Sequence, residues 1–182
     1  VYSKIRAHMG AFDRIFELLD EDVTLQDAPD AVELDGVHEG VRFRDVWFAY
    51  SDEQFVLKDI NLEVQPGQMV AFVGATGAGK SSMIKILSRF YDVDEGAILI
   101  DGIDVRDVTM SSLHSQIGIV FQETFLFNGT VMENLRYGRL NATDEEVIAA
   151  AKAVGAHDFI VNLPDGYDTQ IHEGGSLLSS GQ

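Results

Sequence analysis

Hydrophobic residues recur at steps of three and four along the first twenty residues, with charged residues between them. This spacing predicts an amphipathic helix over residues 1–20, whose apolar stripe must pack against this domain or against a neighbour. The repeating positions are Val1, Ile5, Met9, Phe12, Phe16 and Leu19. Residues 21–40 are acidic and aperiodic and contain Pro29, which predicts a linker.

The pattern then changes from helical spacing to alternation. Alternating apolar residues predict strands over 41–50 and 55–64. The alternation shifts by one residue near Asp45, which predicts a β-bulge there. A further short strand is predicted over 97–100, followed by a turn at Asp101-Gly102.

Two short runs are continuously apolar rather than alternating. Residues 69–73 and 117–121 form these runs, which are typical of strands buried on both faces. Helical patterns over 79–90 and 110–116 come between them. Buried strands that alternate with helices indicate an α/β fold.

Beyond Gln122 the pattern is mainly helical. Helices are predicted over 130–136, 144–154 and 156–163. Thr143 and Glu146 have the spacing of a capping box, which marks the start of the second of these helices.

The composition excludes several classes of protein. Hydrophobic residues make up 46% of the 182 residues and charged residues 24%, as in soluble globular domains. The chain has no cysteine, which excludes disulfides, Cys-ligated metals and a thiol nucleophile. Its net charge of −17 repels phosphate backbones, so a general nucleic-acid binder is not expected, and a site for a polyanion has to be built locally. No apolar run approaches the ~18 residues of a membrane helix.

One segment carries a specific chemical signal. Gly74-Ala75-Thr76-Gly77-Ala78-Gly79-Lys80-Ser81 fits the pattern G-x-x-x-x-G-K-[ST] and follows an apolar run directly. Glycines let backbone N–H groups point inward around an anion, and the following helix adds its positive N-terminal end. Lys80 would supply a charge to phosphates, and the Ser81 hydroxyl could ligate Mg²⁺. Alone, this motif leaves GTPases, kinases, helicases and transport ATPases open.

Three further features are weak when each is taken alone. Gln122 follows the apolar run 117–121, where a side-chain amide can reach a metal or a water at the phosphate site. Tyr50 is an aromatic residue at the end of a predicted strand. Residues 178–182 read Leu-Ser-Ser-Gly-Gln, which by itself indicates only a polar loop.

Taken together, these features resemble the nucleotide-binding domain of an ABC transporter of the exporter type. Gly74 to Ser81 matches the Walker A loop, and Gln122 stands at the Q-loop position. Leu178 to Gln182 resembles the signature LSGGQ, with Ser180 in place of its first glycine. Val46-Trp47-Phe48-Ala49-Tyr50 resembles the strand that carries the A-loop aromatic residue. The resemblance covers residues 41–182 densely.

The resemblance implies a P-loop NTPase core of the RecA-like type with an N-terminal antiparallel β subdomain. Residues 41–122 would form this subdomain and the core, and residues 123–182 the start of an α-helical subdomain that is incomplete at the C-terminus. Residues 1–20 would be the cytoplasmic end of a membrane-domain helix, joined through the linker 21–40. The location implied is the cytoplasmic face of the cell membrane.

The resemblance also implies a role for each matching residue. Tyr50 would stack on adenine, and Ser81 with Gln122 would hold Mg²⁺, Gln122 being the catalytic candidate. The phosphates of ATP would be held by Gly74, Ala75, Thr76, Gly77, Ala78, Gly79, Lys80, Ser81 and Ser82. The ATP of an opposite protomer would be contacted by Ser179, Ser180, Gly181 and Gln182. Two such domains, identical or different, would close head-to-tail around two ATP molecules, and the segment 122–137 would face the coupling helices of the protein's own membrane domain.

Two departures from the family pattern matter. The exporter pattern V-G-E-R-G reads Ile171-His172-Glu173-Gly174-Gly175 here, without the arginine. The Walker B aspartate, the adjacent catalytic glutamate and the switch histidine are not among the 182 residues. We therefore expect the intact parent to be an ATPase, and this chain alone to bind ATP weakly and to hydrolyse essentially none. We also expect exposed apolar surface where core strands of the family are missing.

Two alternatives stay open from the sequence. One is a soluble ABC-type ATPase that acts on nucleic acid or ribosomes, against which the acidity and the exporter-like residues 124–130 argue. The other is a non-catalytic nucleotide-binding fragment. Drug, lipid, peptide and siderophore export all stay open, since the membrane domain would choose the substrate.

Overall fold

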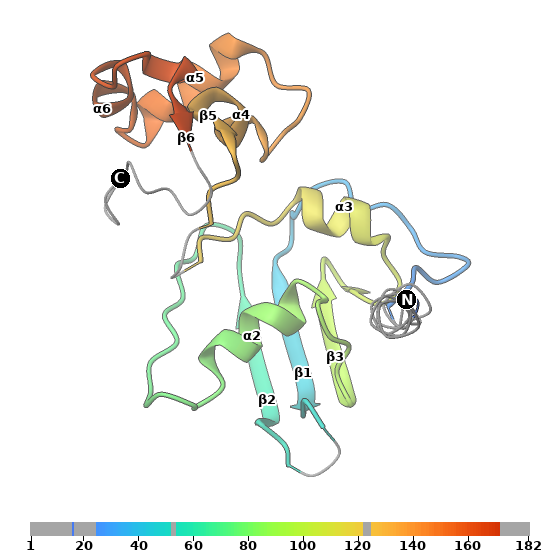
Figure 1. Ribbon diagram of the computed structural model, residues 1–182. Coiled ribbons are helices and arrows are strands. Elements are labelled where there is room, and N and C mark those ends of the chain that lie inside the picture. Colours follow the sequence, from blue (N-terminus) through green and yellow to red (C-terminus); the bar gives the residue numbers. More distant parts are fainter. Residues whose placement is uncertain (1–15, 17–24, 52–53, 122–124, 172–182) are drawn as a thin grey trace, which may run out of the picture. The chain divides into compact units, whose positions relative to one another are not determined.

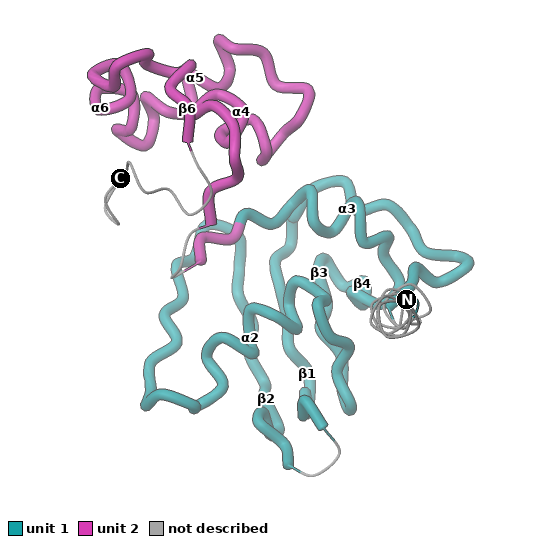
Figure 2. Tube along the Cα trace, in the orientation of Figure 1, with its two compact units in different colours: residues 1–118 teal, residues 119–182 magenta. Residues whose placement is uncertain are grey.

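The computed structural model describes residue 16 and residues 25–51, 54–121 and 125–171. The chain divides into two compact units, residues 1–118 and 119–182 (Figure 2). The predicted helix over 1–20, the Q-loop Gln122 and the signature residues 178–182 lie outside the described residues, apart from Phe16. None of the helices in the described part of the chain combines the length and the apolar character needed to cross a membrane.

The first unit is built on an antiparallel sheet. Its strands are β1 (Val41–Phe48), β2 (Leu57–Val64), β3 (Glu95–Ile100) and β4 (Ile103–Asp104), in the order β2-β1-β3-β4. All three pairings are antiparallel. The antiparallel β subdomain expected from the sequence is therefore confirmed.

The bulge predicted near Asp45 is also confirmed. The register of β1 shifts between Phe43 and Val46 against β2, and between Arg44 and Trp47 against β3. Asp45 itself has a φ of 50°, which lets the strand bend without losing its buried face.

Two helices pack onto this unit. Helix α2 (Lys80–Leu87) lies across one face of the sheet, and α3 (Met110–Ser115) follows β4 (Figure 1). Met83 and Ile86 project from α2 into the main core. The other buried members of that core are Leu34, Phe43, Val46, Phe48, Leu57, Ile98, Ile100, Val105, Val108 and Leu113. The helices predicted over 79–90 and 110–116 are thus present, each slightly shorter than predicted.

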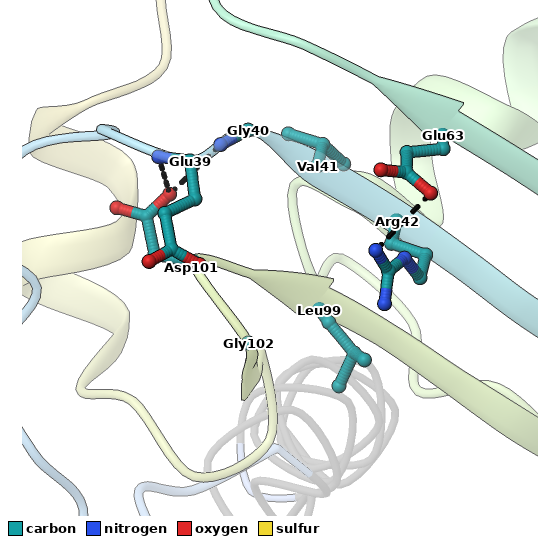
Figure 3. A pocket seen from close by; sticks show the side chains of 8 residues that line it. All are labelled: Glu39, Gly40, Val41, Arg42, Glu63, Leu99, Asp101 and Gly102. Carbon is teal, nitrogen blue, oxygen red and sulfur yellow. Dashed lines mark hydrogen bonds and ion pairs between the residues drawn. The ribbon is translucent and has the colours of Figure 1, made fainter.

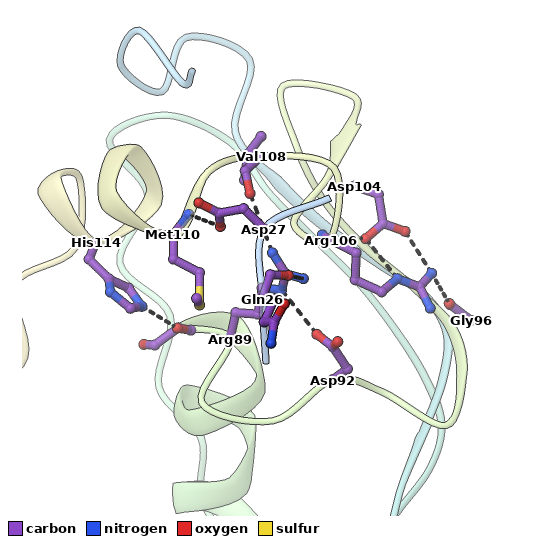
Figure 4. A network of polar contacts seen from close by, with 11 residues as sticks. Gln26, Asp27, Arg89, Asp92, Gly96, Asp104, Arg106, Val108, Met110 and His114 are labelled. Atoms are coloured by element: carbon purple, nitrogen blue, oxygen red, sulfur yellow. Dashed lines mark hydrogen bonds and ion pairs between the residues drawn. The ribbon is translucent and has the colours of Figure 1, made fainter. Parts of the chain in front are cut away.

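Residues 25–40 contain no helix and no strand longer than one bridge residue, but hydrogen bonds hold them against the first unit (Figure 4). The buried Arg89 donates to the carbonyl oxygens of Gln26 at 3.1 Å and of Val108 at 3.3 Å. Asp27 accepts a bond from the backbone N–H of Met110 at 2.8 Å. This part of the expected linker therefore has a fixed course on the first unit.

A single carboxylate fixes the end of the same segment (Figure 3). Asp101 accepts bonds from the backbone N–H groups of His38 at 2.7 Å, Glu39 at 2.6 Å and Gly40 at 2.9 Å. These bonds, led by that from His38, hold the pKa of Asp101 below its ordinary value. Asp101 and Gly102 have φ values of 51° and 80° and form the predicted turn between β3 and β4.

The prediction of strands over residues 69–73 and 117–121 is wrong, because the structure assigns no strand to either segment. Neither segment forms a ladder with any described strand. A strand needs a hydrogen-bonded neighbour, and without one the apolar side chains stay in water. Met69 is 98% exposed, Val73 89% and Val120 97%. These segments therefore expose apolar side chains, whereas the sequence pattern predicted that they would be buried on both faces.

The second unit is small and mainly helical. Its elements are β5 (Gly129–Thr130), α4 (Val131–Arg136), α5 (Asp144–Ala153), α6 (His157–Val161), η1 (Gly166–Asp168) and β6 (Gln170–Ile171). Val131, Ala151, Ile160 and Ile171 form its buried cluster. The capping box predicted for Thr143 and Glu146 is present at the start of α5.

Candidate phosphate-binding site

The glycine-rich loop leads directly into α2. Gly79 precedes the helix with a φ of 88°, in the left-handed region that glycine adopts without strain. A Cβ atom at this position would lie 2.7 Å from the Cδ2 of Leu57. Any other residue at position 79 would therefore strain the backbone and displace the side chain of Leu57.

The loop and the helix present positive groups at the same place. The first turn of an α-helix has backbone N–H groups without intrahelical acceptors, and its N-terminus carries partial positive charge. The Nζ of Lys80 donates to the carbonyl oxygens of Gly74 and Ala75, each at 2.8 Å. The ammonium group is thus held against the loop, where it can exchange these carbonyl oxygens for phosphate oxygens.

Two serines follow the lysine and have different surroundings. Ser81 is exposed in the first turn of α2. Ser82 is only 5% exposed, and its Oγ lies 3.0 Å from the hydroxyl of Tyr50. The structure therefore joins the residue expected to stack on adenine to the helix expected to hold the phosphates.

Tyr50 belongs to an aromatic cluster that the sequence analysis did not single out. Its ring contacts Phe48 at 4.9 Å and Tyr91 at 5.1 Å between centroids, both edge-to-face. The Nζ of Lys85 lies 5.2 Å from the centroid of Tyr50. Lys85 follows Ser82 by three residues in α2, so helical spacing could have placed it on the same face. No pattern in the sequence predicts the contact of Tyr91 with Tyr50, because that contact depends on how the chain folds.

An apolar hollow of about 400 Å³ lies beside Lys80. Its lining includes Ala78, Gly79 and Lys80 together with residues of β2. Its remaining lining includes Ala71, Phe72 and Val73, from the segment that pairs with no described strand. A mainly apolar lining does not suit phosphates, so we assign anion binding to the loop and the start of α2 rather than to this hollow.

The donor set fits a magnesium ion that is shared with phosphates. The exposed hydroxyl of Ser81 is a hard oxygen ligand at the start of α2. Among the described residues, no group of three or more His, Cys, Asp or Glu side chains is placed to hold a metal. Magnesium typically takes one or two protein ligands with phosphate oxygens and water, so one hydroxyl here suits that role.

The second unit carries a separate aromatic surface, whose residues lie within the predicted coupling segment 122–137. Phe125, Phe127 and Tyr137 are 58%, 44% and 62% exposed. Phe127 stacks on Tyr137 at 4.4 Å and contacts Phe125 edge-to-face at 5.1 Å. Asn134 fixes this loop, because its side chain accepts from the N–H of Phe127 and donates to the carbonyl of the same residue. The three rings form a surface that a partner could cover.

Three comparisons place the chain among known proteins. A family model described as ABC transporter matches residues 57–182. The chain is 47% identical over its full length to the ATP-dependent lipid A-core flippase of Syntrophus aciditrophicus (strain SB), of which it covers 30%. It is also 47% identical over its full length to ATP-binding cassette sub-family B member 6 of Mus musculus, of which it covers 22%.

A solved structure agrees in fold as well as in sequence. The structure of a bacterial Atm1-family ABC exporter with ATP bound aligns with 99% of this chain at a TM-score of 0.87 and 43% identity. The chain covers 32% of that exporter, and so spans about a third or less of the length of the proteins it matches. Its fold is that of an ABC-type P-loop ATPase domain with an antiparallel β subdomain. The family match includes the glycine-rich loop and most of the chain, and on these grounds the chain belongs to the ABC transporter family.

Proposed function

We propose that this chain binds ATP with Mg²⁺ at the glycine-rich loop and couples that binding to export across a membrane. The observation that carries the proposal is the junction of loop and helix. Lys80 lies against the loop carbonyls at the start of α2, and the Tyr50 hydroxyl lies 3.0 Å from Ser82 of the same helix. The loop proposed to bind the phosphates and the ring proposed to stack on the base are therefore both connected to α2.

Each residue would then have a distinct task in nucleotide binding. The backbone N–H groups of 74–82 and the Lys80 ammonium would hold the phosphates, and the Ser81 hydroxyl would hold Mg²⁺. The metal would offset phosphate charge and supply a Lewis acid at the terminal phosphate. Tyr50 is 46% exposed, and its ring would stack on the base. Base–aromatic stacking is worth ~1–3 kcal/mol.

Photolabelling tests this assignment of the base. We expect 8-azido-ATP to label a peptide that contains Tyr50, and we expect excess MgATP to prevent the labelling. Tyr50→Leu should reduce the labelling, while Phe55→Leu, a change elsewhere in the same unit, should not. Protected labelling confined to other peptides would contradict the proposed orientation of the nucleotide.

We further propose that the chain acts in a head-to-tail pair of nucleotide-binding domains. The signature residues 178–182 of one protomer would contact the ATP held by the loop of the other, so closure would depend on nucleotide. The chain has no native cysteine, so a single pair can be introduced cleanly. Thr76→Cys with Ser180→Cys should give a disulfide-linked dimer that forms faster with MgATP. Cross-linking that is indifferent to nucleotide would count against the pair.

The proposed transport role rests on the relatives and on the second unit. The curated relatives are an ATP-dependent flippase and a member of an ATP-binding cassette family, and the solved neighbour is an exporter. Phe125, Phe127 and Tyr137 would then meet the coupling helices of a membrane domain at the cytoplasmic face of the membrane. Replacing Phe127 with Ala in the whole protein should lower ATP-driven transport more than it lowers ATP binding.

We also propose that ATP hydrolysis requires residues beyond these 182. The family carboxylates that position and polarise the attacking water are not in this sequence. Without such a group, phosphoryl transfer to water lacks its positioning element. Phosphate release by this chain should therefore equal that of its Lys80→Ala variant, and turnover above that control would refute this point.

A further inference from the structure

Tyr50 lies at the surface but is enclosed by neighbours from three segments. Phe48, 2% exposed, lies beneath it at the end of β1, with its ring at 78° to that of Tyr50. Tyr91 follows α2 in the chain and meets Tyr50 at 87°. Phe48 and Tyr91 also contact each other, at 5.6 Å between centroids. The three rings therefore form a closed triangle, and loss of Tyr91 would leave Tyr50 with one aromatic neighbour among the described residues.

Helix α2 holds the same ring at two points. Ser82 lies within hydrogen-bond distance of its hydroxyl, and the Nζ of Lys85 lies 5.2 Å from its centroid. The same ammonium lies 5.8 Å from the centroid of Tyr91. A cation at this range is attracted to the face of an aromatic ring. Lys85 therefore connects both tyrosines to the helix that begins at the phosphate loop.

We infer that Tyr91 and Lys85 are positioning residues that fix the Tyr50 ring for stacking on the nucleotide base. The inference rests on the proposed function, because it assumes that Tyr50 stacks on adenine. An exposed aromatic ring loses rotational freedom when a base stacks on it, and a ring that is already fixed loses less. Tyr91 and Lys85 act through Tyr50 and not on the phosphates.

Two ligands separate this role from a general structural one. MgATP carries base and phosphates, whereas magnesium tripolyphosphate carries phosphates alone. Tyr91→Leu should weaken MgATP binding about fivefold, the order expected for one aromatic pair, and leave tripolyphosphate binding unchanged. Tyr91→Phe keeps the ring and should restore MgATP binding. Lys85→Met should weaken MgATP binding about threefold, and Lys85→Arg should retain it.

The control is an edge-to-face pair in the same unit but outside the cluster. Trp47 and Phe55 lie 5.2 Å apart between centroids, and Phe55→Leu should leave the MgATP-to-tripolyphosphate affinity ratio unchanged. A double variant tests the coupling between the two tyrosines. In a Tyr50→Leu background, Tyr91→Leu should cause no further loss of MgATP affinity, because the ring that Tyr91 positions is absent.

The outcomes distinguish this inference from the proposed function. The positioning role is overturned if Tyr91→Leu weakens the binding of both ligands equally. It is also overturned if the losses of MgATP affinity in Tyr91→Leu and Tyr50→Leu are fully additive. In both cases the proposal that ATP binds at the loop still stands. A wild-type chain that binds neither ligand, or binds both with no dependence on Lys80, overturns the proposed function and this inference with it. A selective loss of MgATP affinity that Tyr91→Phe restores supports the inference.

Discussion

The hydroxyl of Tyr50 and the Oγ of Ser82 lie 3.0 Å apart, joining the end of β1 to the first turn of α2. Tyr50→Phe and Ser82→Ala each remove this bond, and each should weaken MgATP binding by about fivefold, from a hydrogen bond worth ~1 kcal/mol. The double variant should be no weaker than the more affected single variant. Calorimetric titration of the four proteins measures the coupling. Strictly additive losses would show that the two hydroxyls act independently.

Gly79→Ala should disrupt the start of α2. The φ of 88° strains any residue with a Cβ, and the added atom would lie 2.7 Å from Leu57. We expect a loss of about 1–2 kcal/mol in the free energy of unfolding from the backbone strain, together with weaker MgATP binding.

Gly67→Ala is the matched control for that variant. Gly67 has a φ of 77°, but a Cβ there would meet nothing within 4 Å. Gly67→Ala should lower the free energy of unfolding in urea by a similar amount, because the backbone strain is similar, and should leave the affinity for MgATP unchanged. If both variants weaken MgATP binding equally, the close approach of Gly79 to Leu57 has no special role.

Asp101→Asn should reduce stability in a manner that depends on pH. The pKa of Asp101 is below its ordinary value of 3.8, chiefly because the N–H of His38 donates to the carboxylate, so ionised Asp101 favours the folded state. Its contribution is fully present above pH 3.8 and is lost as the pH falls below that value through the lower folded pKa. Because the bonds to His38 and Glu39 are exposed to water and the Asn side-chain oxygen can still accept hydrogen bonds, we expect Asp101→Asn to cost at most about 1 kcal/mol at pH 7.

The measurement is urea unfolding of wild type and Asp101→Asn between pH 7 and pH 3. The difference in the free energy of unfolding between the two proteins should become smaller towards pH 3, because protonated Asp101 no longer carries the negative charge that favours hydrogen bonds from the N–H groups of His38, Glu39 and Gly40. Asp30→Asn, at an exposed position, should have little effect at any pH. A difference that is constant with pH would contradict the assignment.

Thr143→Ala should destabilise the second unit. Thr143 accepts from the N–H of Glu146, whose side chain accepts from the N–H of Thr143 in return. Loss of an N-cap hydroxyl costs ~1 kcal/mol. Hydrogen exchange of the amides in α5 should quicken in Thr143→Ala and return towards wild type in Thr143→Ser. Unchanged exchange in Thr143→Ala would show that packing alone holds the start of the helix.

Local chemistry made several elements predictable from the sequence. The bulge at Asp45, the turn at Asp101-Gly102 and the capping box of Thr143 each depend on residues near one another in the chain. The family resemblance is borne out by the match over residues 57–182. Nothing in the structure tests the roles of Gln122 and of residues 178–182, which stay predictions.

The features that the sequence analysis predicted wrongly or did not predict depend mostly on contacts between distant segments of the chain. Residues 69–73 and 117–121 have the composition of buried strands, but a strand also requires a hydrogen-bonded neighbour. The contact of Tyr91 with Tyr50 joins residues about forty positions apart, and no local pattern encodes it. The capping box of Thr130 and Glu133 was missed, although its spacing is readable in the sequence.

Calorimetric titration with MgATP tests the central claim most directly. We expect saturable binding of one nucleotide per chain, lost or weakened at least tenfold in Lys80→Ala, because the ammonium held at Gly74 and Ala75 would form charge-assisted hydrogen bonds with the phosphates. Lys58→Ala, which removes an exposed lysine from β2, should bind as wild type. Equal affinities in wild type, Lys80→Ala and Lys58→Ala would show that the glycine-rich loop does not hold the nucleotide.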